Sequence, residues 1–190
     1  MAPNLGATPP PLLGEEVWLS NWHYGYNQRL PRALEEWTRY FNLHSRKHQI
    51  ETYPDGYKWY QKQDGTRPIY FQKVDPTIPG CIAFPGPLLQ EHFKTSDKPQ
   101  RFFTFTGAWL MALAMHEGFE RVELWGFELR STKPAYKWER PCFFYWVKQL
   151  QDAGIEVMIP PELDMTRDTE AGDPNAYVGP LYGYETKPED

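Results

Sequence analysis

The chain has little of what several classes of protein depend on. Only two cysteines, Cys81 and Cys142, occur among 190 residues, which excludes a framework of disulfide bonds. The N-terminal stretch does not combine basic residues with an apolar core of about 7 to 15 residues, so we expect no secretory signal. The longest apolar run, Ala108 to Met115, is far shorter than the roughly 20 residues that span a bilayer. We therefore expect a soluble, cytoplasmic protein without a membrane span.

Positive charge is also scarce. The chain has 20 Lys and Arg against 25 Asp and Glu, which gives a formal net charge of −5 and a pI near 5.6. Proteins that bind bare nucleic acid rely on dense Lys and Arg to contact phosphates, so we expect no bulk nucleic-acid binding. His44 and His48 are four residues apart, but no cluster of Cys, Asp or Glu at ligand spacing accompanies them. This pattern favours capping, packing or surface histidines over metal binding, and we expect no metal site.

Aromatic and proline residues are abundant instead. The chain has eight tryptophans, twelve tyrosines and 19 prolines, and 41% of its residues are hydrophobic, which is ample for one globular core. Residues 1–14 read as a Pro-rich N-terminal arm and residues 162–190 as an irregular acidic tail. We expect a single α/β domain over residues 15–161.

The stretch from Phe102 to Leu129 carries the clearest pattern. Thr106 is placed to cap a helix whose residues Ala108 to Met115 are all apolar, so that helix must be buried. Gly118 falls where a left-handed C-terminal cap belongs, and Arg121 to Phe127 then reads as a short buried strand. A buried helix that leads into a strand is half of a helix-and-parallel-sheet unit.

The following residues complete a crossover. Arg130 to Arg140 reads as a polar loop, and Pro141 is suited to begin a helix that ends at Gly154 and turns Phe143, Trp146, Val147 and Leu150 inward. Ile155 to Ile159 alternates as a strand. The order from Val122 to Ile159 therefore predicts a strand, a helix and a second, parallel strand.

The N-terminal half predicts shorter elements. We expect strands at Glu16–Asn21, Ile69–Gln72 and Cys81–Phe84, each next to turn-forming residues. Pro31 is placed to open a helix with an apolar stripe of Leu34, Trp37, Tyr40 and Phe41. A turn at Pro54–Gly56 precedes a short helix or aromatic loop, and Pro87–Phe93 reads as another short helix. The fold class is α/β, with a mainly parallel sheet flanked by helices.

Two segments resemble a known family. FTFTGAWLMALAMHEGFERVELWGFEL resembles the pattern S-G-x-x-M-x-x-x-A-x-x-x-G-(Y/F)-x-x-I-x-L-x-G-(I/V)-D of a bacterial sialyltransferase family and of related glycosyltransferase-like proteins in phage genomes. RPCFFYWVKQLQDAGIEVMIPPE is similar to the closing helix and strand of the phage-type relatives, and the likeness is clearest from Thr104 to Pro161. It implies a Rossmann-like fold and a metal-independent glycosyltransferase with a nucleotide-sugar donor as substrate and no cofactor.

The resemblance implies roles for individual residues. Asn21 matches an Asn that contacts the nucleotide sugar, and Thr106 and Gly107 match a Ser-Gly pair at a helix start beside the nucleotide, where free N–H groups favour an anion. Tyr136 matches a phosphate-contacting Tyr, and Arg130 replaces another such Tyr and suits phosphate as well. Trp138, whose ring suits stacking on a base or sugar, and Arg140 belong to the same predicted binding loop.

The chain also departs from the family. Family members begin with a strand and a Gly-rich turn, but only the loop-like MAPNLGATPPPLLG precedes the strand that ends at Asn21, so the first strand and its turn are missing. The family's general base is a late His, whereas the last His here is His116. The catalytic candidates are therefore Glu128, at the position of a family Asp, and Glu139 and His23.

Several of these residues also suit purely structural roles. Asn21 is suited to bond turn backbone, Thr106 to cap its helix, and Glu128 to pair with Arg130 or Arg140. One alternative function is that of a non-catalytic module that sequesters a ligand or docks a protein through aromatic loops, and another is that of a phage enzyme that modifies nucleotides or DNA. The sheet edge left open by the absent strand also predicts self-association as a homo-oligomer.

Overall fold

The computed structural model describes residues 16–20, 36–95, 100, 102–125, 127 and 136–159, apart from the side chains of Tyr136 and Lys137. The chain divides into two compact units, unit 1 from Met1 to Pro85 and unit 2 from Gly86 to Asp190, and each is described on its own. The predicted N-terminal arm and C-terminal tail lie outside the described residues. A single domain over 15–161 stays a prediction.

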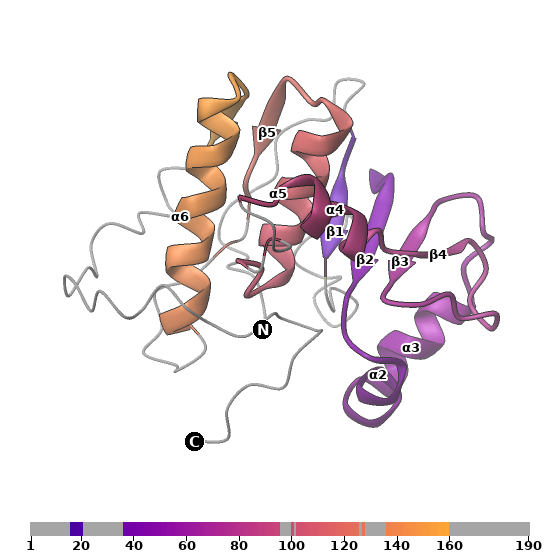
Figure 1. Ribbon diagram of the computed structural model, residues 1–190. Helices are drawn as coiled ribbons and strands as arrows, with labels where there is room; N and C mark the ends of the chain where they lie inside the picture. Colours follow the sequence, from indigo (N-terminus) through magenta and orange to yellow (C-terminus); the bar gives the residue numbers. More distant parts are fainter. Residues whose placement is uncertain are drawn as a thin grey trace. The chain divides into compact units, whose positions relative to one another are not determined.

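Unit 1 contains a parallel sheet of four strands whose spatial order follows the chain (Figure 1). The strands are β1 (Trp18–Ser20), β2 (Arg39–Asn42), β3 (Ile69–Phe71) and β4 (Cys81–Ala83). All neighbouring pairs are parallel. The predicted mixed α/β architecture with a parallel sheet flanked by helices is thereby confirmed, as are the strands predicted around β1, β3 and β4.

A hydrophobic core of unit 1 lies on one face of this sheet. The strand register places Leu19, Tyr40, Ile69 and Cys81 in one row across the four strands, and side chains in one row share a face. Helix α3 (Pro54–Gln61) packs Tyr57 and Tyr60 against that face. The buried residues of this core are Leu19, Trp37, Tyr40, Tyr57, Tyr60, Ile69, Phe71 and Ile78.

The helices of unit 1 begin in two different ways. Helix α2 (Arg46–Thr52) is capped by Ser45, whose hydroxyl accepts a hydrogen bond of 3.1 Å from the backbone N–H of His48. Helix α3 instead starts at Pro54, which has no N–H that would need a partner. The predicted turn at Pro54–Gly56 is therefore wrong, because these residues form the first turn of α3.

The predicted helix with Tyr40 and Phe41 on its apolar stripe is also wrong, because residues 39–42 form β2. Residues 31–35 of that prediction lie outside the described part of the chain. The backbone N–H of Tyr40 donates to the carbonyl of Pro68 at 3.0 Å, and that of Arg39 donates to Val17 at 3.3 Å. Bonds to strands on both sides therefore outweigh the local helical spacing.

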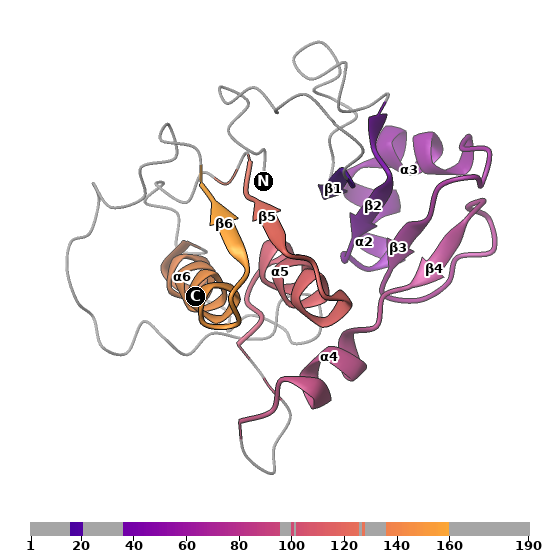
Figure 2. The ribbon, with the colours of Figure 1, turned by 90° about the horizontal axis from the view of Figure 1, so that it is seen from above.

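Unit 2 is built around a second parallel pair of strands, β5 (Arg121–Glu123) and β6 (Glu156–Met158). Helix α6 (Tyr136–Asp152) connects them, which confirms the predicted crossover. Figure 2 shows α5 (Thr106–Glu117) and α6 on the same side of this pair. Helix α4 (Gly86–His92), close to the predicted Pro87–Phe93, precedes them. The strand predicted as buried is half exposed, since Arg121 faces solvent.

Helix α5 is the buried helix that the sequence predicts, and its nine residues from Thr106 to Ala114 are all buried. Gly118 ends it with φ 79°, in the left-handed region that the predicted cap requires. Its start differs from the prediction, because Thr106 is the first helical residue and Phe105 occupies the N-cap position without a side-chain cap.

Helix α6 also starts earlier than predicted. It begins at Tyr136, so Pro141 lies inside the helix and residues 136–140 are not a loop. A proline removes one hydrogen bond within a helix. Burial of Phe143, Trp146 and Leu150, predicted to face inward, offsets that loss. No helix in the described part of the chain is long and apolar enough to cross a bilayer.

Candidate functional site

Half of the predicted site lies where the structure gives no side chains. Asn21, His23, Glu128 and Arg130 are outside the described residues, and Tyr136 is placed only as the first residue of α6. Their predicted roles in nucleotide binding and catalysis therefore stay predictions.

The remaining predicted residues lie in the first turns of α5 and α6, and the segment that leads into α5 contacts the first turn of α6. The hydroxyl of Thr104, two residues before Thr106, donates to the backbone carbonyl of Trp138 at 2.8 Å. Phe127, beyond β5, has its ring 5.7 Å from that of Phe143 in α6. The N-termini of two helices thus lie beside the segment that follows β5. An N-terminus presents unpaired N–H groups and favours negative charge.

Aromatic side chains cover the first turn of α5. A Cβ atom built on Gly107 would lie 2.4 Å from ring atoms of both Phe105 and Phe127. Thr106 is only 2% exposed. Position 107 therefore needs glycine so that these two rings can approach the helix. A ligand that reaches the N–H groups of this turn must share the space with them.

Glu139 lies in the first turn of α6, where the helix dipole stabilises a carboxylate, and is 6% exposed. It lies near Cys142, whose thiol donates to the carbonyl of Phe102 at 3.1 Å. Burial raises the pKa of the Cys142 thiol to about 12, and the negative charge of Glu139 also raises it. The Cys142 thiol is therefore protonated at neutral pH and acts as a structural donor.

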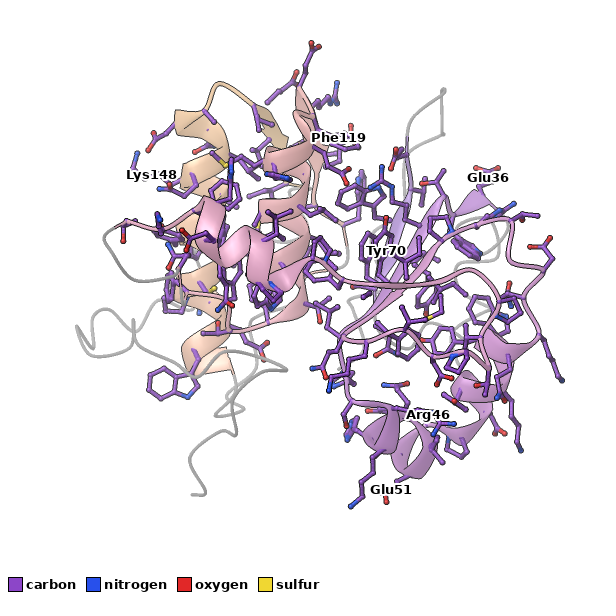
Figure 3. The ribbon with its side chains drawn as sticks, turned by 45° about the vertical axis from the view of Figure 1, so that its right-hand side comes forward. Glu36, Arg46, Glu51, Tyr70, Phe119 and Lys148 are labelled. Atoms are coloured by element: carbon purple, nitrogen blue, oxygen red, sulfur yellow. The ribbon has the colours of Figure 1, made fainter. Side chains whose placement is uncertain are left out.

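A second polar cluster, in unit 1, was not predicted from the sequence. Asp75 is 3% exposed, and its Oδ2 accepts hydrogen bonds from the Tyr57 hydroxyl at 2.6 Å and from Arg46 Nε at 2.7 Å. Its Oδ1 accepts from the Thr77 backbone N–H at 3.0 Å and from the Thr77 hydroxyl at 2.7 Å. Figure 3 labels Arg46, whose side chain is partly exposed. We call these four residues the Asp75 cluster.

The hydrogen bonds of the Asp75 cluster determine the charge of its carboxylate. Burial by itself would raise the pKa of Asp75, but hydrogen bonds from Tyr57, Thr77 and Arg46 outweigh it and lower the pKa to about 2. Both oxygens already accept two hydrogen bonds each. Asp75 is thus a permanently charged anchor for the segment between β3 and β4, not a group that exchanges protons near neutral pH.

The Asp75 cluster borders a shallow, open depression of about 500 Å³. Its lining residues come from the loops before β3 and β4 and from β4 itself: Gly65, Thr66, Pro68, Val74, Asp75, Pro76, Ile78, Gly80, Cys81 and Ile82. Burial raises the pKa of the Cys81 thiol, so it is not a thiolate at neutral pH. The lining offers apolar contact surface and no acid–base pair.

Two pairs of histidines are in contact. The ring centroids of His44 and His48 are 4.8 Å apart, and those of His92 and His116 are 4.5 Å apart. Within the described ranges, no group of three or more His, Cys, Asp or Glu residues is arranged to hold a metal ion.

Comparison of the chain with protein-family models, curated proteins and solved structures found no match in any of the three.

Proposed function

We propose that the chain is a sialyltransferase-like glycosyltransferase that binds its nucleotide-sugar donor at the end of unit 2 where α5 and α6 begin. The observation that carries this proposal is the meeting of two helix N-termini beside the segment after β5, one of them without a side-chain cap. The parallel strands and the quoted sequence resemblance support it. A Rossmann-like arrangement of the sheet and helices is part of the proposal.

In this proposal the donor phosphate accepts hydrogen bonds from the N–H groups of Thr106 and Gly107, with Tyr136 and Arg130 beside it. Trp138 and Arg140 contact the base or sugar. An acceptor hydroxyl attacks the anomeric carbon while the bond from that carbon to the phosphate oxygen breaks. Glu128 or Glu139 takes the hydroxyl proton, and the nucleotide leaves with the bonding electron pair.

A thermal-shift assay with a panel of nucleotides and nucleotide sugars tests donor binding. A donor at 100 times its Kd stabilises the folded chain by about 2.7 kcal/mol. Arg130→Ala and Tyr136→Phe should each reduce this shift, whereas Lys148→Ala, on the exposed side of α6, should leave it unchanged. The proposal is wrong if none of the compounds stabilises the chain, or if the two site variants bind as well as the wild type.

A non-catalytic binding or interaction module is the second candidate. The packing of Phe105 and Phe127 against Gly107 favours it, because these rings occupy space beside the N–H groups that a donor phosphate would contact. Such a module would bind a nucleotide without transferring or hydrolysing its sugar. Release of nucleotide from a stabilising nucleotide sugar, followed by chromatography, would identify the enzyme, and binding without release would identify the module.

A further inference from the structure

Strand β4 is the last strand of its sheet in the described part of the chain, and on its outer side the N–H of Cys81 already donates to the carbonyl of Ile78 at 3.2 Å. The carbonyl of Gly80 accepts from the N–H of Ile69 at 3.0 Å, and the N–H of Phe84 donates to Phe71 at 2.7 Å. Backbone groups of alternate residues point to the same side of a strand, so those of Cys81 and Ala83 point away from β3. Among the described residues no strand pairs with this side. The backbone groups of Ala83 are thus placed to bond an added strand.

Apolar side chains adjoin this open edge. Val74 is 59% exposed and Ile82 is 44% exposed, and both line the depression beside β4. Sheet edges are commonly protected by charged side chains, but β4 consists of Cys81, Ile82 and Ala83. An exposed edge next to apolar side chains and a depression fits an extended peptide, which bonds through its backbone and inserts alternate side chains.

The residues that line the depression are already ordered in the free chain. Asp75 anchors the segment between β3 and β4 through its four hydrogen bonds. Gly80 has φ 70° and packs so closely that an added Cβ atom would lie 2.9 Å from the carbonyl oxygen of Arg67. A surface that is already ordered loses less conformational entropy when it binds a partner.

Charge indicates the chemistry of the partner. Asp75 is paired with Arg46, so it adds no net charge to the surface. Lys73, next to Val74, is exposed and makes no ion pair within the described part of the chain. An isologous contact between two copies would contain Lys73 twice, whereas a carboxylate on a peptide would neutralise it. The charge therefore favours an acidic partner over a second copy.

We propose that the open side of β4 and the adjoining depression bind an extended, acidic segment of a partner protein, which adds to the sheet as a fifth strand. An apolar side chain of the segment enters the depression between Val74 and Ile82, and a carboxylate contacts Lys73. Pro79 and Pro85 flank β4, so the added strand can pair with only a short stretch of it. This surface belongs to unit 1 and does not depend on the donor site proposed in unit 2.

Selection from a random library of peptides of about 12 residues, displayed on phage against the full chain, tests this proposal. The selected peptide is synthesised, and its affinity is measured by fluorescence anisotropy. Ala83→Pro removes the outward N–H without touching the bonds to β3, and prolines are tolerated at such edge positions. We expect Ala83→Pro and Val74→Asp to weaken binding about tenfold, and Lys73→Glu about fivefold.

Leu88→Asp is the matched control, because Leu88 is an apolar residue of similar exposure on α4. It should leave the affinity unchanged, and circular dichroism establishes that each variant is folded. Val74→Asp keeps the test valid if Ala83→Pro fails to fold, since Val74 is on the surface. The proposal is overturned if selected peptides bind the β4 variants as tightly as the wild type. It is also overturned if light scattering shows that the wild type is a dimer and that Ala83→Pro and Val74→Asp are monomers.

Discussion

The interiors of the two units both contain aromatic rings but differ in the polar groups that accompany them. In unit 1 a single buried carboxylate, Asp75, accepts hydrogen bonds from Arg46 of α2, Tyr57 of α3 and Thr77 of the loop before β4. In unit 2 the rings stack most closely, with Phe103 3.8 Å from Trp109 and 4.9 Å from Trp146 between ring centroids. Aromatic rings pack in both interiors, and unit 1 adds directed hydrogen bonds to a buried carboxylate.

This difference predicts opposite sensitivities. Removal of a hydrogen-bonded carboxylate lowers the stability of the fold, because its donors then lose their acceptor. A larger side chain next to closely packed rings also lowers stability, because the neighbouring side chains must move. Unit 1 should therefore respond most to loss of a polar group and to acid, and unit 2 to the addition of a single methyl group.

The largest expected effect is that of Asp75→Ala. The substitution removes the acceptor for all four hydrogen bonds, including that of the buried Tyr57 hydroxyl. We expect a loss of about 3 kcal/mol in the free energy of unfolding, measured by urea denaturation with tryptophan fluorescence.

The same measurement at acidic pH is the control for this prediction. The pKa of Asp75 is lowered to about 2 in the folded chain, so its stabilisation is fully present above the unfolded value of about 3.9 and is lost as pH falls toward 2. The difference between the wild type and Asp75→Ala should therefore shrink over that pH range. A difference that stays constant down to pH 2 would contradict the role of the charge.

Gly107→Ala should have the next largest effect. The new Cβ atom would clash with Phe105 and Phe127, and we expect a loss of about 2 kcal/mol in the free energy of unfolding. Gly118→Ala is a matched control in the same helix. Its φ of 79° disfavours alanine, but nothing lies within 4 Å of an added Cβ atom, so it should cost about 1 kcal/mol. Equal losses would show that the rings move aside freely.

The smallest expected effect on stability is that of removing the N-cap of α2. Ser45 caps α2, whereas α5 has no side-chain cap, so Ser45→Ala should cost about 1 kcal/mol in the free energy of unfolding. Ser45→Asp retains a cap oxygen and should restore most of the loss. If both variants lose the same stability, the hydroxyl of Ser45 does not act as a cap.

The sequence predicts those elements whose signals are local. The apolar run of α5, its glycine cap at Gly118 and the inward stripe of α6 each lie within one element, and the structure confirms them. It also confirms the crossover between β5 and β6. By contrast, Tyr40 and Phe41 have helical spacing but lie in β2, because strands on both sides supply their hydrogen bonds.

The Asp75 cluster shows why the polar site of unit 1 could not be predicted. Asp75, Pro76 and Thr77 form a short turn pattern that is visible in the sequence, since Asp side chains bond backbone two residues on. Arg46 lies 29 residues away along the chain, and no local pattern relates it to Asp75. In unit 2, the pairing of Thr104 with Trp138 over 34 residues is equally long-range.

The order of the strands in unit 1 bears on how that sheet forms. Because each strand pairs with the one before it in the chain, a ribosome that releases the chain from its N-terminus delivers every new strand to a neighbour already made. No strand of this four-stranded sheet waits for a later segment to be inserted between two earlier ones. Sheet assembly can thus keep pace with synthesis, which shortens the time that apolar edges stay uncovered.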